Sequence, residues 1–146
     1  MSYFNVRVYG LLIDPEKGIL VSDEQSEGRQ FIKFPGGGLE LGEGLKDALM
    51  REFREECEVE IEVLEHFYTT DFYEQSSFND SQIISIYYFV REKQPLPMDF
   101  KTSAFDFSEG SKQSFRWIPL SALQPQDVTF KTDRTVVELL LKQQGV

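Results

Sequence analysis

A proline and three consecutive glycines, Pro35 to Gly38, stand directly before the segment with the strongest helical signal in the chain. Proline and glycine interrupt ordinary strands and helices, so a loop with a special backbone path is expected there. From Gly44 to Cys57 almost every residue is a good helix former and none is proline, which predicts a helix. The loop can therefore bring backbone groups close to side chains on this helix.

One stripe of the helix changes from aliphatic to acidic along its length. Successive side chains are rotated by about 100°, so Leu45, Ala48 and Leu49 share the face that we expect to pack on a sheet. One turn further on, the same stripe carries three glutamates. Their neighbouring carboxylates repel one another, and burying an unpaired charge is costly, so a cation is expected beside them. Hard divalent ions such as Mg²⁺ or Mn²⁺ prefer such oxygen ligands, although an arginine or lysine could also serve. The residues that continue the stripe are Glu52, Glu55 and Glu56.

The acidic run has a second interpretation as a solvated, charged patch on an amphipathic helix, which is how most such runs are explained. Helix periodicity alone does not distinguish the two. The glycine loop immediately before the helix favours the metal-binding interpretation, because loop and carboxylates converge.

The other segments predict an α+β chain with strands on both sides of this loop and helix. A terminal amphipathic helix is expected over Thr132 to Gln143. With 146 residues, of which 40% are hydrophobic, we expect one domain over residues 1–146. Strands are expected over residues 4–13, 18–22, 30–34, 60–70, 82–90 and 114–118, with a polar loop over 71–81 and an irregular connection over 92–110.

The formal net charge of −10 disfavours binding to extended nucleic acid. A metal ion among carboxylates can reverse the local sign of the potential, so small phosphorylated substrates remain open. The single cysteine, Cys57, excludes an intrachain disulfide and a zinc site of several thiolates, which fits a reducing, cytoplasmic setting. No apolar stretch is long enough to predict a membrane segment, and we expect neither membrane insertion nor export.

Residues 37–59 resemble the Nudix box, G-x5-E-x7-R-E-U-x-E-E-x-G-U, where U is a bulky apolar residue. Phe53 stands at a U position where aliphatic residues are commoner, and Glu58 replaces the final glycine. That glycine follows the helix, where a left-handed residue often ends it, so Glu58 is expected to cost on the order of 1 kcal/mol or to change the cap. The matching positions are Gly37, Glu43, Arg51, Glu52, Glu55 and Glu56.

The resemblance implies the Nudix fold, a mixed β-sheet sandwiched between helices (α/β/α), and a Nudix hydrolase activity. This activity is divalent-metal-dependent hydrolysis of a diphosphate bond in a nucleoside-diphosphate-linked substrate. The substrate classes left open are nucleoside triphosphates, nucleotide sugars and ADP-ribose, since residues 74–77 carry neither the proline nor the tyrosine that marks particular subfamilies. The implied cofactor is Mg²⁺, for which Mn²⁺ can substitute.

The resemblance also implies a role for each matched residue. Glu52, Glu55 and Glu56 would hold the metal, with the backbone carbonyl of Gly37 as a further ligand. Glu43 and Arg51 would form a salt bridge that fixes the loop to the helix. The general base would be Glu55, Glu56 or an acidic residue outside the box, for which the candidates are Glu74, Asp80, Asp106 and Glu109.

Other interpretations remain open at this stage. One alternative is a noncatalytic Nudix-like module that senses a nucleotide, in which the box carboxylates would normally be replaced by other residues. A third hypothesis is a structural domain with a solvated acidic helix. Many members of the family are dimers, so a homodimer is one assembly to expect. Arg7 and Arg29 could meet the terminal part of a phosphorylated ligand, but solvated surface arginines explain them equally well.

Overall fold

The computed structural model describes residues 2–143, which divide into two compact units. The first unit comprises the chain up to Leu12 together with residues 35–97, and the second comprises residues 13–34 and those from 98 onward. Strand β1 (Phe4–Asp14) passes from the first unit into the second. The strands pair in both parallel and antiparallel fashion and the chain has two α-helices, which confirms the α+β class with a mixed sheet. The single-domain organisation stays a prediction.

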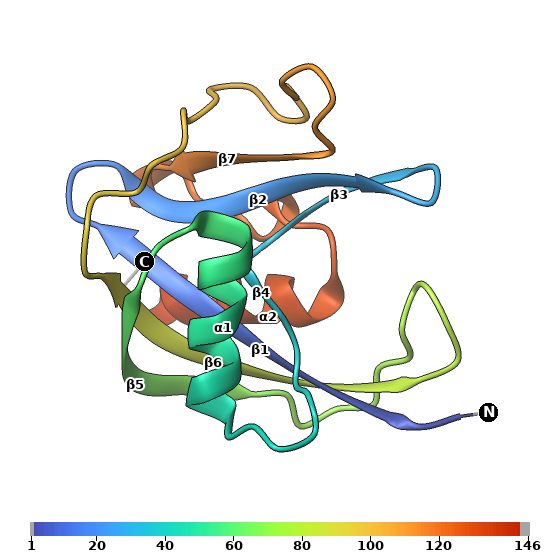
Figure 1. Cartoon of the computed structure of the whole chain (residues 1–146). Coiled ribbons are helices and arrows are strands. Elements are labelled where there is room, and N and C mark those ends of the chain that lie inside the picture. Colours follow the sequence, from blue (N-terminus) through green and yellow to red (C-terminus); the bar gives the residue numbers. More distant parts are fainter. Residues whose placement is uncertain (1, 144–146) are drawn as a thin grey trace. The chain divides into compact units, whose positions relative to one another are not determined.

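The first unit is built on a parallel pair of strands. β1 and β6 (Gln82–Glu92) run in the same direction in continuous register from Phe4 opposite Gln82 to Leu12 opposite Val90. β5 (Ile61–Thr69) pairs with β6 in the antiparallel direction, as Figure 1 shows. The helix α1 (Leu45–Cys57) contacts β5 and the short strand β4 (Gly36–Gly38). These contacts place α1 beside the glycine-rich segment.

A close approach between Gly10 and Phe53 sets the position of α1 on β1. A Cβ atom at Gly10 would lie 2.5 Å from Phe53 Cε1, so the aromatic ring occupies the space that any other residue would fill. Leu49, Phe53 and Cys57 are fully buried at spacings of four residues and form the inward line of the helix. The sheet contact is therefore made by an aromatic ring that lies directly in line with Leu49.

This packing corrects the predicted helix face. The three glutamates were expected to continue the inward stripe, but the buried line runs on through Phe53 and Cys57. Glu52 and Glu56 flank it and are half-buried, whereas Glu55 is exposed. The prediction is wrong for Glu55 because the buried Phe53 ring fills the space at Gly10 and so takes the inward position on the helix.

The proline–glycine segment also differs from its expected form. Gly36 to Gly38 form β4, which pairs with β1 so that Gly36 lies opposite Tyr9 and Gly38 opposite Arg7. Gly36 has φ of 147°, and a Cβ atom there would lie 2.1 Å from the carbonyl oxygen of Val8. Only glycine can bring the backbone this close, so the same residues that break ordinary strands allow this pairing.

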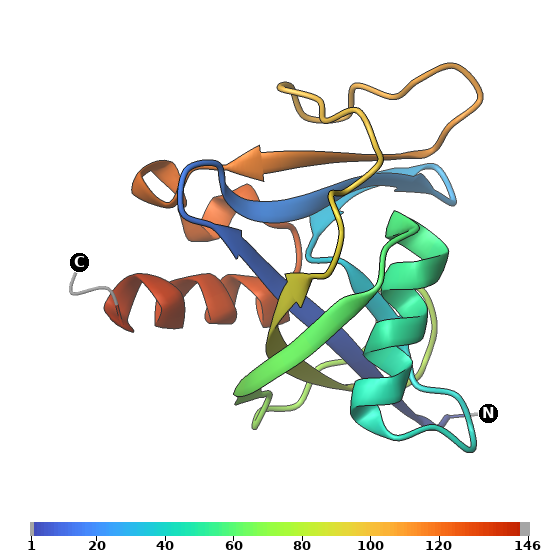
Figure 2. The same ribbon diagram turned by 60° about the vertical axis from the view of Figure 1, so that its left-hand side comes forward.

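The second unit contains the strands β2 (Gly18–Ser26), β3 (Arg29–Lys33) and β7 (Gln113–Ile118). β2 is the central strand and pairs with β3, with β7 and with the last residues of β1 in the antiparallel direction. The fully buried carboxylate of Asp23 accepts hydrogen bonds of 2.7 and 3.0 Å from Arg116, which ties β2 to β7. The helix α2 (Lys131–Gln143) contacts the second of two short 3₁₀ helices, Leu120–Ala122 and Pro125–Asp127 (Figure 2).

The predicted strands and both predicted helices are confirmed, with ends that differ by a few residues. The two 3₁₀ helices are additional elements. No helix within residues 2–143 is long and apolar enough to cross a membrane.

Candidate active site

Arg51 clamps the loop before α1 to the helix. Its Nε and Nη2 atoms donate hydrogen bonds of 2.6 and 2.9 Å to the two carboxylate oxygens of Glu43. Both side chains are about four-fifths buried, with 19% and 18% of their surface exposed. Glu43 also accepts a hydrogen bond from the backbone N–H of Glu40, so the loop closes on itself. The ion pair that the resemblance implied is present in this structure.

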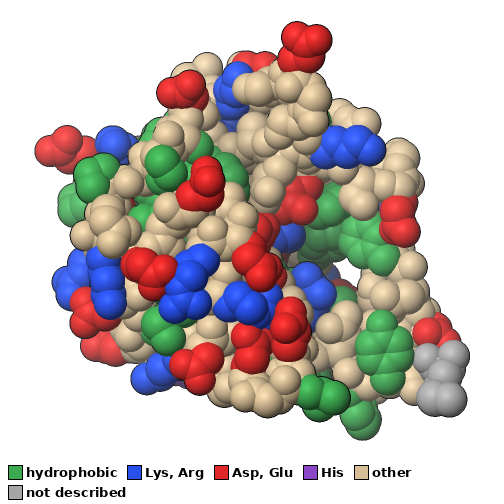
Figure 3. All heavy atoms as spheres, viewed as in Figure 1, with side chains coloured by type: hydrophobic (Ala, Val, Ile, Leu, Met, Phe, Trp, Pro, Cys, Tyr) green, Lys and Arg blue, Asp and Glu red, His purple; other side chains and the backbone are tan. Residues whose placement is uncertain are grey.

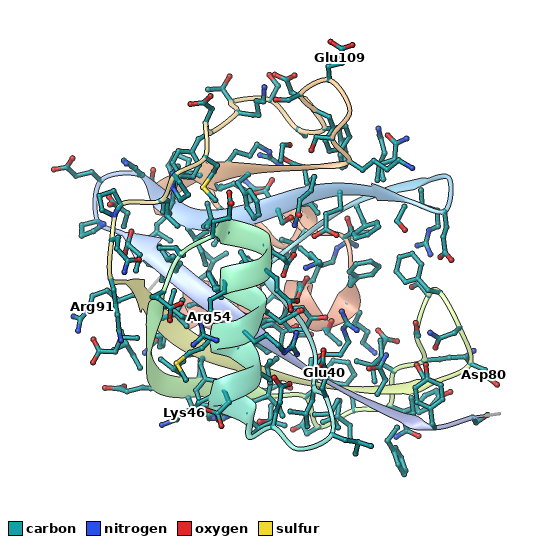
Figure 4. The ribbon with its side chains drawn as sticks, viewed as in Figure 1. Glu40, Lys46, Arg54, Asp80, Arg91 and Glu109 are labelled. Atoms are coloured by element: carbon teal, nitrogen blue, oxygen red, sulfur yellow. The ribbon has the colours of Figure 1, made fainter. Side chains whose placement is uncertain are left out.

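The remaining donors of Arg51 reach the glycine strand and the helix. Nη2 donates to the carbonyl oxygen of Gly38 at 2.9 Å, and Nη1 donates to Glu55 Oε1 at 3.2 Å. Weaker ion pairs join Nη1 to Glu40 at 3.4 Å and to Glu52 at 3.6 Å. Glu40 lies on the loop that precedes α1 (Figure 4). Arg51 therefore holds loop, strand β4 and helix in one arrangement.

These contacts shift the pKa values of the two partners in the directions that favour the charged forms. The hydrogen bond from Arg51 lowers the pKa of Glu43 below its ordinary value. The hydrogen bond to Glu43 raises the pKa of Arg51, and the nearby charges of Glu52 and Glu40 add to this effect. The clamp is therefore ionised over the whole physiological pH range.

Glu52 lies against the backbone of Gly37. A Cβ atom at Gly37 would lie 2.4 Å from each carboxylate oxygen of Glu52, so the missing side chain makes room for the carboxylate. The neighbouring Gly38 leaves more space, because the nearest atom to its Cβ position is Arg7 Nη1 at 3.7 Å. Glycine at position 37 thus allows the Glu52 carboxylate to lie against the backbone.

The three box glutamates differ in exposure and contacts. Glu52 and Glu56 each bury one carboxylate oxygen, Oε2 in both cases. Glu55 is 59% exposed and pairs with Arg51 four residues earlier. Within residues 2–143, no three His, Cys, Asp or Glu side chains converge on one point at metal-binding distance. The structure therefore brings Glu52 to Gly37 and leaves Glu55 on the clamp.

The donor set nevertheless suits a divalent cation. Glu52 and Glu56 each offer a buried carboxylate oxygen, and the Glu52 carboxylate fills the space that a Cβ atom at Gly37 would take. Such oxygens are the hard ligands that Mg²⁺ and Mn²⁺ prefer. Figure 3 shows acidic and basic side chains gathered over α1 on the same face of the molecule.

Glu58 occupies the position of the final box glycine and adopts the left-handed conformation that glycine favours there. Its φ and ψ are 52° and 40°, and its backbone N–H donates to the carbonyl oxygen of Arg54 to close the helix. The cap geometry is kept although the residue is not glycine, so the expected strain lies in the backbone of Glu58.

The acidic residues outside the box lie on two loops. Glu74 and Asp80 belong to the loop between β5 and β6, where Glu74 is half-buried and Asp80 is exposed near the start of β6 (Figure 4). Asp106 and Glu109 lie on an exposed loop of the second unit. Each of these four stays a candidate for the general base.

Sequence reasoning left Arg7 undecided, but the structure places it beside the box. Arg7 lies on β1, and its Nε donates a 2.6 Å hydrogen bond to the hydroxyl oxygen of Tyr9. The interaction with Tyr9 raises the pKa of Arg7 against the opposing effect of burial, and the charges of Glu52 and Glu56 add to the rise. The signal in the sequence was the spacing of two residues, which puts both side chains on one face of a strand.

A family model of the NUDIX domain matches residues 4–140. This match spans nearly the whole chain and includes the clamp, the glycine strand and the three glutamates. The chain belongs to the NUDIX domain family, the family of the Nudix hydrolases. No curated protein matches the chain at a significant level.

Several solved structures share this fold. A MutT protein from Methanosarcina mazei Go1 has a TM-score of 0.71 and 13% identity, over 98% of this chain and 96% of that chain. A MutT NUDIX hydrolase from Burkholderia pseudomallei has a TM-score of 0.69 and 18% identity, over 92% and 96%. An ADP-ribose pyrophosphatase from Streptococcus suis has a TM-score of 0.63 and 15% identity, over 96% and 91%. At these identities the likeness concerns the fold.

Proposed function

We propose that this chain hydrolyses the diphosphate bond of a nucleoside-diphosphate-linked substrate in a reaction that depends on a divalent metal ion. The observation that carries the proposal is the approach of the Glu52 carboxylate to Gly37, which puts acidic oxygens against the backbone of the glycine strand. The family membership supports the same reaction class.

Glu52, Glu55 and Glu56 are the proposed metal ligands, and the carbonyl of Gly37 is a further one. Glu55 would turn from Arg51 toward the ion, which its exposure on the helix surface permits. A bound ion would supply charge neutralisation at the diphosphate and a lower pKa for the attacking water. The preferred ion is Mg²⁺, and Mn²⁺ would substitute for it.

The residues of the chain have separate tasks in this reaction. Arg51 and Glu43 hold the loop in place so that Gly37 and Glu52 keep their spacing. Glu55 or Glu56 takes the proton from the attacking water, or an acidic residue outside the box does so.

The substrate is a nucleoside triphosphate, a nucleotide sugar or ADP-ribose, and proteins described as MutT and as an ADP-ribose pyrophosphatase share the fold. A cytoplasmic location and a homodimer stay predictions.

The test is product release from a panel of nucleoside triphosphates, nucleotide sugars, ADP-ribose and dinucleoside polyphosphates, with Mg²⁺, with Mn²⁺ and with chelator. We expect turnover of one class that chelator abolishes. Glu56→Gln should lose most of this turnover and keep the fold. Glu62→Gln, which removes the same charge from an exposed pair with Arg91, should keep it.

Two outcomes would contradict the proposal. Unchanged turnover in Glu56→Gln would show that the metal assignment is wrong. Tight binding of one compound without turnover of any would favour a nucleotide-sensing module instead.

A further inference from the structure

Arg7 is held at the edge of the acidic site by a single anchor. Within residues 2–143, its side chain makes one hydrogen bond, from Nε to the hydroxyl oxygen of Tyr9. The guanidinium carbon lies 5.8 Å from the centre of the Tyr9 ring. Tyr9 is itself buried and stacked on Tyr87 with ring centres 5.3 Å apart. The anchor is therefore rigid, and it fixes the inner edge of the guanidinium.

The outer edge of Arg7 carries donors that this anchor does not use. A guanidinium has five N–H groups, and the bond to Tyr9 occupies only the one on Nε. Arg51 is different, because all three of its nitrogens bind Glu43, Gly38 or Glu55. Every nitrogen of the Arg51 guanidinium thus donates a hydrogen bond within the protein, whereas Nη1 and Nη2 of Arg7 can donate to a bound ligand.

The position of this outer edge follows from the strand register. Arg7 lies opposite Gly38 on β4, and its Nη1 is 3.7 Å from the place of a Gly38 Cβ atom. The preceding glycine, Gly37, is the one against which the Glu52 carboxylate packs. Arg7 also interacts electrostatically with Glu52 and Glu56. The spare donors therefore lie one residue along β4 from Gly37 and within electrostatic range of two proposed metal ligands.

A cation at this place weakens metal binding, because like charges compete for the same carboxylates. It suits the anion that a metal would bring, since arginine forms strong, charge-assisted hydrogen bonds to phosphate oxygens. A half-buried arginine with unused donors in electrostatic range of the proposed metal ligands is thus arranged for a phosphate group.

We propose that Arg7 is a substrate-binding residue whose Nη1 and Nη2 atoms donate hydrogen bonds to a nonbridging oxygen of the substrate's diphosphate. The proposal rests on the proposed hydrolase function and adds a residue from outside the Nudix box. Tyr9 is the positioning residue that orients Arg7 through its hydroxyl oxygen.

The first test compares Arg7→Gln with Arg91→Gln. Arg91 lies on β6, away from the loop that carries Glu40, in an exposed pair with Glu62, so both variants lose one positive charge in the same unit (Figure 4). The probe is imidodiphosphate, a diphosphate with nitrogen as the bridging atom, titrated by calorimetry in Mg²⁺. We expect Arg7→Gln to weaken binding about tenfold or more and to raise KM with little change in kcat. Arg91→Gln should match the wild type.

The second test measures Mn²⁺ binding by water-proton relaxation without any phosphate ligand. Arg7→Gln should bind Mn²⁺ severalfold more tightly than the wild type, because the competing charge is gone. Arg7→Lys keeps the charge and should bind Mn²⁺ like the wild type, but it should lose part of the imidodiphosphate affinity because lysine lacks the planar fork. Opposite changes in the two affinities are what a merely structural arginine would not produce.

The third test is a double-mutant cycle between Arg7 and Tyr9. Tyr9→Phe keeps the ring stacked on Tyr87 but removes the hydroxyl oxygen that accepts from Nε. It should weaken imidodiphosphate binding less than Arg7→Gln does, and the double variant should bind no worse than Arg7→Gln alone.

The outcomes separate this assignment from the proposed function. Unchanged imidodiphosphate affinity in Arg7→Gln would overturn the assignment, and so would a parallel loss of both affinities with a lower Tm. Arg7-dependent binding of imidodiphosphate in a protein that turns over no substrate would support the assignment while the hydrolase proposal failed.

Discussion

Arg51 grips Glu43 with two parallel hydrogen bonds, of 2.6 Å from Nε and 2.9 Å from Nη2, while the same Nη2 binds the carbonyl oxygen of Gly38. A single side chain on α1 thus fixes both the loop and the glycine strand. This geometry requires the planar fork of arginine, which lysine cannot reproduce with its single ammonium group.

Arg51→Lys should therefore lower kcat/KM about tenfold or more, as is typical when a residue that supports metal ligands is changed. The matched control is Arg54→Lys, one turn further along α1, where Arg54 Nε pairs with Glu60 at 2.6 Å on the exposed surface. That variant should keep full activity. Steady-state kinetics with circular dichroism checks both, and equal losses in the two variants would contradict a special role for the clamp.

Two adjacent glycines give a second matched pair. Gly37→Ala places a methyl group where the Glu52 carboxylate lies, and the flexible glutamate side chain is what must move. We expect metal affinity to fall by roughly tenfold with little loss of stability. Gly38→Ala meets only Arg7 Nη1 at an ordinary contact distance of 3.7 Å and should retain metal affinity. Mn²⁺ titration of both variants measures the difference, and equal Mn²⁺ affinities of the two variants would contradict the proposed role of Gly37.

The sequence predicted the helix and the strands because each depends on local spacing, and the resemblance to the Nudix box implied the partners of the clamp. The interval between Glu43 and Arg51 spans a loop and two helical turns, and the observed ion pair fits it. Residues 45–57 form the predicted helix because their propensities and the glycine before them agree.

The sequence could not predict which side of α1 faces the strands at its acidic end. Leu49 is followed at four residues by Phe53 and at three by Glu52, and periodicity allows either line to be the inward one. The space left by Gly10 for the Phe53 ring decides it, and Gly10 is far away in the chain. The strand at Gly36–Gly38 was missed for a similar reason, since its pairing depends on the approach to Val8.

The left-handed helix cap predicts a stabilising substitution. Glu58 has φ of 52°, where a Cβ atom is strained and glycine is not. Glu58→Gly should raise the free energy of unfolding by up to about 1 kcal/mol. Glu58→Ala removes the same charge but keeps the Cβ atom, so it should not stabilise the protein. Urea denaturation of the three proteins measures this, and a loss of stability in Glu58→Gly would show that the glutamate side chain contributes more than the strain costs.

The clamp also predicts how stability depends on pH. Arg51 lowers the pKa of Glu43 in the folded chain below its ordinary value of 4.5. The unfolded chain then takes up the proton at a higher pH than the folded chain does, so acid favours unfolding. The stabilisation from Glu43 is fully present above pH 4.5 and is lost as the pH falls through the lower folded pKa.

Glu43→Gln removes this dependence, because glutamine does not ionise. The difference in unfolding free energy between the wild type and Glu43→Gln, measured by urea denaturation from neutral pH to about one unit below the ordinary glutamate pKa, should therefore shrink in acid. A difference that stays constant or grows would show that Arg51 does not hold Glu43 ionised in solution.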